Sequence, residues 1–312
     1  MMCCQWKHRW SKWVVVALLL VAAPAAAAEL RVFACEPEWA ALSAALGGDR
    51  VSVDMATTAA QDPHYVQARP GLIALARSAD LLVCTGADLE AGWLPLLLRK
   101  SGNGAIQPGR PGHFLAAEQV SLLEVPERLD RALGDIHAAG NPHLALDPRR
   151  LLGVAERLAE RLAAIDPEGA AAYREHLAGF RSRWRAAIAG WEMRAAPLRG
   201  RRVATHHPTF TYLEDWLGLE RVAMLEPRPG IPPSSGHLAG LLEKFRAAPV
   251  DLILHASYED ARPAGWLAGK IGVPVLRLPA SPEGPPEGVE TLESWMESLV
   301  AALLQTTGLG AR

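Results

Sequence analysis

Short apolar runs alternate with segments of helical periodicity along most of the chain, beginning near residue 30. In the first half, each strand-like run is followed by apolar residues that recur every three or four positions. The predicted strands span 30–35, 50–55 and 80–84, and the predicted helices span 36–48, 70–80 and 88–102. Gly47 is expected to stop the first helix, and Pro95 is expected to kink the third. This alternation predicts a parallel sheet with helices on its faces.

The alternation breaks at residues 101–140, where Gly and Pro are frequent and a long loop is predicted. Asp147-Pro148 then has the pattern of a helix start, and helical sequence runs from there to about Ile165. A second helical segment, 169–196, would extend about 45 Å. Such a helix is either a plain surface helix or a spine that joins two lobes, and the α/β pattern on both sides favours the spine.

The α/β pattern resumes after Gly200. The predicted strands span 201–207, 250–256 and 273–279, and the predicted helices span 208–218, 234–248, 262–272 and 290–304. We therefore predict an α/β protein of two lobes with parallel sheets, 29–145 and 199–312, joined by a long helical linker at 146–198. Ligands of open α/β sheets bind beyond the carboxyl ends of the strands, so the cleft between the lobes is the expected binding site.

The first 28 residues have the pattern of a secretory signal peptide. Lys7, Arg9 and Lys12 precede a short apolar run, which ends in Pro24 and four alanines before Glu29. The alternative is a membrane anchor, but the apolar run is shorter than the roughly 20 residues that a spanning helix needs. Residues 1–28 are therefore expected to be cleaved on export to the periplasm, which moves the net charge from −2 to near −5.

Export changes the interpretation of the four cysteines. Cys3 and Cys4 leave with the leader, whereas Cys35 and Cys84 end two predicted strands in an oxidising compartment. They either form a disulfide or remain two buried thiols, since the sequence does not test the geometry that a disulfide requires. A lipid-attachment box ending at Cys35 is disfavoured, because the apolar leader ends well before it.

Composition excludes several classes of function. Lys plus Arg number 32 and Asp plus Glu number 34, and no basic stripe occurs, so nucleic-acid binding is not expected. The absence of a Cys-x-x-Cys pair excludes zinc fingers, iron–sulfur ligation and thioredoxin-type redox motifs.

Three Pro-flanked histidines lie where a cleft is expected: His64 after the second strand, His143 before the helical linker and His207 after the first strand of the second lobe. Three neutral imidazoles suit Zn²⁺, and they avoid the oxidation to which thiolates are prone. Asp62 and Asp147 are candidates to accept a hydrogen bond from the second ring nitrogen. Taken singly, each histidine is more simply explained as a solvated loop residue.

The motifs around these histidines resemble those of the zinc-binding substrate-binding proteins of bacterial ABC importers, the ZnuA/TroA-like family. In chain order they are DPH at 62–64 followed by Ala68-Arg69-Pro70, ADLLVCTGADLEAGWL at 79–94, NPHLALDP at 141–148, HPTFTYLEDWLGL at 207–219 and PSSGHLAGLLEKFR at 233–246. The resemblance covers essentially the whole chain after the leader. It implies a two-lobed fold with a metal cleft and a long central helix.

By this resemblance, His64, His143 and His207 fall on the family's three histidine ligands. The aromatic residues that follow favour His207 over its neighbour His206. Manganese-binding members commonly have Glu in place of the third histidine, so His207 favours Zn²⁺, with Mn²⁺ the less expected cargo.

The fourth ligand is not determined by the resemblance. The family usually supplies a carboxylate from a Leu-Asp-Pro loop, but the matching stretch here reads Arg277-Leu278-Pro279. Candidates for the fourth donor are Glu36, Glu259, Asp260, Glu283 and water. The family's His- and Asp-rich loop is also absent, leaving His113 and His137 in this region. His137 is expected to be a solvated loop residue, with metal collection as the alternative.

The expected function is a monomeric periplasmic solute-binding protein, not an enzyme, that captures Zn²⁺ and delivers it to the permease of an ABC importer. Its affinity should fall below about pH 6, as imidazoles take up protons. A zinc-dependent hydrolase with Glu36 as base is the alternative, although no HExxH or GxSxG motif occurs. A third possibility is a structural protein whose metal only staples the lobes, and such a protein should unfold when the metal is stripped.

Overall fold

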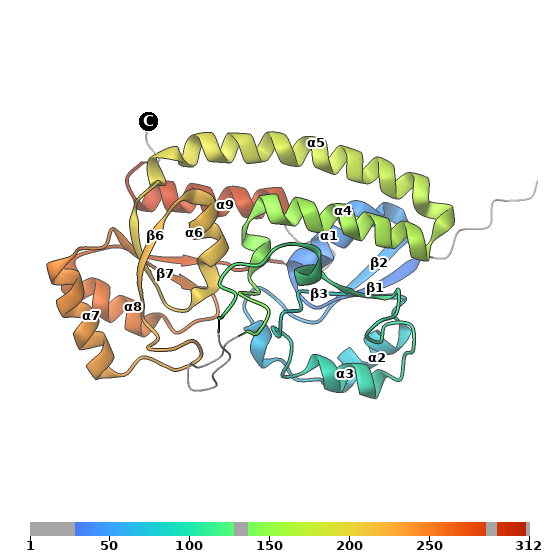
Figure 1. Ribbon diagram of the computed structural model, residues 1–312, viewed down its shortest axis with the longest axis horizontal. Coiled ribbons are helices and arrows are strands. Elements are labelled where there is room, and N and C mark those ends of the chain that lie inside the picture. The colour runs from blue at the N-terminus through green and yellow to red at the C-terminus, as the bar shows by residue number, and fades with distance from the viewer. Residues whose placement is uncertain (1–28, 128–136, 285–291, 310–312) are drawn as a thin grey trace, which may run out of the picture.

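The computed structural model describes residues 29–127, 137–284 and 292–309, and within them it contains two four-stranded parallel sheets with helices on both faces. The strand orders are β2-β1-β3-β4 and β6-β5-β7-β8, so the two lobes have the same strand arrangement. The predicted fold class, two α/β lobes with parallel sheets and a long connecting helix, is confirmed (Figure 1).

The central strands of the first sheet, β1 and β3, are apolar at every position except Arg31, because helices cover both faces of the sheet. Val32 packs in one core cluster with residues of α1 and α4, and its neighbour Phe33 packs in another with residues of α2 and α3. Successive strand residues point to opposite faces, so a strand buried on both faces reads as a continuous apolar run. The elements are β1 Leu30–Ala34, α1 Pro37–Gly47, β2 Val51–Met55, α2 Pro70–Ser78, β3 Leu81–Cys84, α3 Leu94–Ser101, β4 His113–Leu115 and α4 Pro148–Ile165.

The second sheet is built in the same way. Val203 packs with residues of α6 and α9, and Ala204 packs with residues of α7 and α8. The elements are β5 Arg202–Thr205, α6 Thr211–Leu217, β6 Glu220–Met224, α7 Ser235–Ala247, β7 Leu252–Ala256, α8 Ala261–Ile271, β8 Val275–Leu278 and α9 Leu292–Thr306.

The longest described helix, α5 (Ala170–Ala195), has 26 residues and runs along the top of both lobes in Figure 1. It contacts α1 and α4 at one end and α9 at the other. Trp184 is fully buried and donates a hydrogen bond to Pro148 O at 2.7 Å, while Trp191 packs edge-on against both Trp184 and Trp216. One continuous apolar core therefore joins the lobes on the side of α5.

Three local predictions were wrong. Strands β4 and β6 were not predicted; β4 lies inside the predicted loop 101–140, and both are sheet edges. One has only three residues, and the other has no fully buried position, so neither carries the apolar run of a central strand. Pro95 does not kink a helix over 88–102, because α3 begins at Leu94 and places the proline in its first turn.

Cys35 and Cys84 form a disulfide, which decides between the two alternatives left by the sequence. β1 and β3 are parallel neighbours with Ala34 opposite Val83, and the cysteines follow these residues with their Cα atoms 4.8 Å apart. The bond occupies the Cys35 sulfur, so that sulfur is not available for lipid attachment. The predicted signal peptide lies outside the described residues, and none of the described helices is long and apolar enough to cross a membrane.

Candidate metal centre

His64 is held by a tight 3-10 turn, Pro63–Tyr65, that follows β2. Asp62 starts this turn: its Oδ1 accepts a hydrogen bond from His64 N at 3.0 Å and lies 2.7 Å from His64 Nδ1. Burial opposes ionisation of Asp62, but the hydrogen bonds from His64 and the positive charges that His64 and His207 can carry together outweigh it and lower the pKa of this carboxyl. Trp93 Nε1 donates to Pro63 O at 2.9 Å and ties the turn to the first lobe.

His143 lies in the Asn-Pro-His segment that leads into α4, and Asn141 fixes its backbone. Asn141 Oδ1 accepts a hydrogen bond from His143 N at 3.0 Å. Asn141 Nδ2 donates to Pro208 O at 2.8 Å and to Thr211 Oγ1 at 3.1 Å. One asparagine therefore joins the His143 segment to the turn that follows His207.

His207 lies two residues after the end of β5 and directly precedes the 3-10 turn Pro208–Phe210. Its Nδ1 lies 2.8 Å from Glu226 Oε2, which also accepts a hydrogen bond from Gly230 N at 2.9 Å. Glu226 lies two residues after the end of β6, the strand that was not predicted from the sequence. It was consequently missed as a partner of His207, whereas Asp62 was foreseen.

The structure brings the three predicted histidines together. Their ring centroids are 5.7 Å apart for His64 and His143, 5.8 Å for His64 and His207, and 6.0 Å for His143 and His207. One nitrogen from each ring lies within 4.8 Å of the other two. Because Asp62 and Glu226 each occupy an Nδ1, the Nε2 atoms of His64 and His207 are left for a ligand.

His143 is the most deeply placed of the three histidines. Burial lowers its pKa well below the usual value, and the positive charges that His64, His207 and His137 can carry lower it further. His143 is therefore neutral near pH 7, the form in which imidazole binds a metal.

The four carboxylates considered as a fourth donor have different surroundings. Glu259 lines a cavity of about 280 Å³ with His64 and His207, accepts a hydrogen bond from Ala256 N at 2.7 Å, and has its pKa raised to about 8 by burial. Glu36 is buried against Thr85, lines a different cavity of about 20 Å³ with His143, and has a pKa raised by burial and by Glu90.

Asp260 and Glu283 have weaker links to the histidines. Asp260 caps α8 and pairs with Arg262, whose hydrogen bonds lower the pKa of Asp260 to about 2. Glu283 is exposed, and no contact in the described part of the chain joins it to the three rings. Asp147 also does not serve the site: it caps α4 and pairs with Arg149 and Arg150.

Of the other histidines considered from the sequence, His113 and His206 contact groups other than the three rings, whereas His137 contacts His64. His113 lies on β4, and its Nδ1 is 2.9 Å from Ile106 O. His206 Nε2 lies 3.9 Å from Glu226 Oε1. His137 does not lie in a solvated loop, as had been expected: it is half-buried, and its Nε2 is 3.2 Å from His64 Nε2. No local pattern marks His137, because its partner is 73 residues away.

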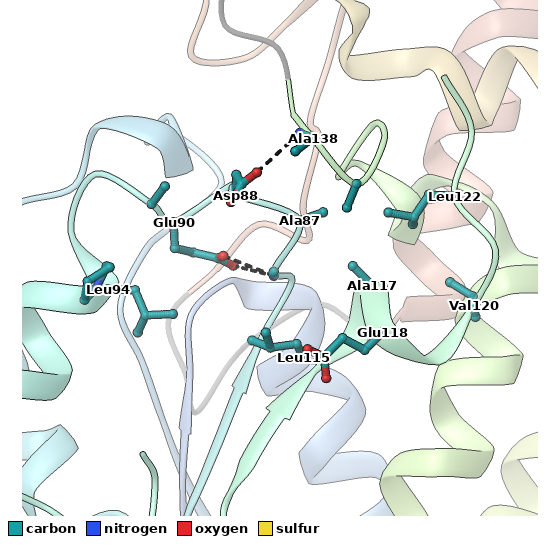
Figure 2. A pocket seen from close by; sticks show the side chains of 14 residues that line it. Ala87, Asp88, Glu90, Leu94, Leu115, Ala117, Glu118, Val120, Leu122 and Ala138 are labelled. Carbon is teal, nitrogen blue, oxygen red and sulfur yellow. Dashed lines mark hydrogen bonds between the residues drawn. The ribbon is translucent and has the colours of Figure 1, made fainter. Parts of the chain in front are cut away.

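A larger cavity of about 680 Å³ lies in the first lobe and is separate from the histidines (Figure 2). Its lining is mostly apolar, with residues such as Leu94, Leu115 and Leu122, and it contains no histidine. The Glu90 carboxylate points to the backbone, where Oε2 accepts a hydrogen bond from Gly86 N at 3.0 Å. This cavity offers no ligand set for a transition metal, so the histidine group remains the candidate centre.

Comparison with known proteins matches this chain to binding proteins for metal ions. The sequence profile of a family described as ZnuA, zinc-uptake complex component A, periplasmic, matches residues 32–306. The zinc-binding lipoprotein AdcA of Streptococcus pneumoniae serotype 4 is 24% identical over 269 residues, which are 84% of this chain and 52% of AdcA. The chain thus spans about half the length of that relative. The manganese ABC transporter substrate-binding lipoprotein PsaA of Streptococcus pneumoniae is 21% identical over 238 residues, covering 74% of this chain and 73% of PsaA.

Solved structures show the same fold. A crystal structure of ZnuA superimposes with a TM-score of 0.73 at 20% identity, over 89% of this chain and 99% of that one. The substrate-binding protein FpvC from Pseudomonas aeruginosa, in complex with Mn²⁺, superimposes with a TM-score of 0.72 at 22% identity, over 90% of this chain and 98% of FpvC.

Proposed function

The chain belongs to the ZnuA family of periplasmic zinc-uptake components, and on this premise we propose that it is an exported substrate-binding protein that captures Zn²⁺ and delivers it to the membrane permease of an ABC importer. The observation that carries the proposal is the convergence of three imidazoles from three distant segments, each with a nitrogen within 4.8 Å of the others. The family consists of substrate-binding proteins rather than enzymes, so the hydrolase alternative is set aside.

In this proposal the metal is held by His64, His143 and His207. His64 comes from the first lobe, His143 from the segment before α4, and His207 from the second lobe. We propose the division 1–28 signal peptide, 29–145 first lobe, 146–198 helical linker and 199–312 second lobe, with the mature protein a periplasmic monomer. The core along α5 joins the lobes and supports only limited movement between them.

The donor set supports zinc as the cargo. Imidazole suits Zn²⁺, whereas manganese prefers sites rich in oxygen donors. Of the carboxylates considered as a fourth donor, Glu259 shares a cavity with His64 and His207, but burial raises its pKa to about 8 and so disfavours the charged form that binds a metal. Relatives include both a zinc and a manganese protein, so their names do not decide the metal.

Titration of the purified, metal-stripped full chain tests this function. We expect one Zn²⁺ to bind tightly at pH 7.5, Mn²⁺ to bind more weakly, and zinc affinity to fall at pH 5.5 because protons compete for the imidazole nitrogens. Isothermal titration with a competing chelator measures both affinities. A protein that takes up no divalent metal tightly at pH 7.5 would rule the proposal out.

The carboxylates behind two of the histidines give a prediction of their own. Asp62→Asn and Glu226→Gln are each expected to weaken Zn²⁺ binding by about 10- to 100-fold, because each change removes the charged acceptor that holds a ring N–H. Competition titration measures the loss. Asp260→Asn, in which Asn still caps α8, is the matched control and should bind like the wild type. Unchanged affinity in both test variants would show that these carboxylates do not orient the ligands.

A further inference from the structure

His137 lies beside the histidine group, although it belongs to none of the motifs around the other three. Its Nε2 is 3.2 Å from His64 Nε2, and the two ring centroids are 5.3 Å apart at an interplanar angle of 41°. The neighbouring residue Ala138 is fixed to the first lobe, since its N donates to Asp88 Oδ2 at 3.3 Å. His137 therefore lies next to the candidate centre, on a segment that is anchored to the first lobe.

The two nitrogens have the geometry of two ligands on one ion. Asp62 holds His64 through Nδ1, which leaves Nε2 as the ring nitrogen for a ligand, and Nε2 is the atom that lies next to His137. In a tetrahedral zinc site with bonds of 2.0–2.1 Å, neighbouring ligand atoms are about 3.3 Å apart. The Nε2–Nε2 distance matches this separation.

We propose that His137 supplies the fourth metal ligand, an imidazole in place of a carboxylate, and that it thereby favours Zn²⁺ over Mn²⁺. This inference rests on the proposed function. The chain lacks a carboxylate in its Arg277-Leu278-Pro279 stretch, and Glu259, which lines the cavity, is engaged by Ala256 N and Thr209 Oγ1. A fourth nitrogen donor completes the coordination number that zinc adopts most often, whereas manganese gains less from it.

The rival explanation makes the opposite prediction. If the 3.2 Å contact is only an N–H···N hydrogen bond of the empty protein, His137 competes with zinc for the His64 lone pair. Removing His137 would then leave zinc affinity unchanged or increase it.

The test compares His137→Ala and His137→Gln with His113→Ala, a control in the same half of the chain whose ring contacts Ile106 O. Zn²⁺ and Mn²⁺ are titrated separately into each metal-stripped full-length protein. X-ray absorption of the zinc-loaded forms counts the imidazole donors. Thermal unfolding without metal checks that the variants are folded.

We expect both His137 variants to bind Zn²⁺ about 10- to 100-fold more weakly, a loss at least as large as the one caused by mutating a residue that only supports a metal ligand. The preference for Zn²⁺ over Mn²⁺ should fall, and the imidazole count should drop from four to three. Wild-type protein that binds zinc with three imidazoles, together with His137 variants of undiminished affinity, would overturn this inference while leaving the proposed function intact. Failure of the wild type to bind zinc would overturn both.

Discussion

Replacing His64, His143 and His207 together by alanine is expected to remove tight zinc binding from the folded protein. Each residue contributes one of the nitrogens that lie within 4.8 Å of one another, so the triple variant lacks the centre on which the ion would sit. We expect the stoichiometry to fall from one Zn²⁺ to none, a loss of at least about 1,000-fold or about 4 kcal/mol. Metal analysis after dialysis, followed by calorimetric titration, measures it.

The same variant distinguishes a metal carrier, which stays folded without metal, from a protein whose fold depends on the bound metal. The three histidines lie in loops that follow strands or precede α4, and none of them belongs to the apolar core that joins the lobes along α5. The metal-free triple variant should therefore melt at a temperature close to that of the metal-free wild type. His237→Ala, on α7, serves as the control for loss of a histidine elsewhere. Zinc bound one-to-one by the triple variant would show that the wrong residues were chosen.

Removing the disulfide is expected to lower the stability of the fold. Cys35 and Cys84 are separated by 49 residues. Opening a loop of this length restores entropy to the unfolded chain worth about 4 kcal/mol. Both sulfurs are buried in an apolar cluster, so Cys35→Ala with Cys84→Ala avoids placing a hydroxyl there. Urea unfolding of the metal-free proteins measures the change.

Reduction of the wild type provides the comparison for this variant. The double alanine variant should unfold at a lower urea concentration than the oxidised wild type, and reductant should shift only the wild-type curve. Working without metal avoids binding of zinc by the reductant. Coincident curves for the variant and the oxidised wild type would contradict the expected stabilisation.

The central strands and the flanking helices could be predicted because their signals are local. Val32 and Phe33 are both apolar because the sheet is covered on both faces, and this produces the run that marks β1. β6 has no such signal, since it is an edge strand whose residues stay partly exposed. Missing β6 also concealed Glu226, which follows it and contacts His207.

Sequence alone determined the order of the described helices and of the described strands other than β4 and β6. It also placed His64 and His207 after strands and His143 before a helix, because these features depend on residues close together in the chain. Only the tertiary structure joined Cys35 to Cys84 and brought His137 to within 3.2 Å of His64. Those pairs are 49 and 73 residues apart. These contacts form only because the packing of sheets and helices brings the two loops together. The sequence of one loop therefore does not indicate which distant residue it will contact.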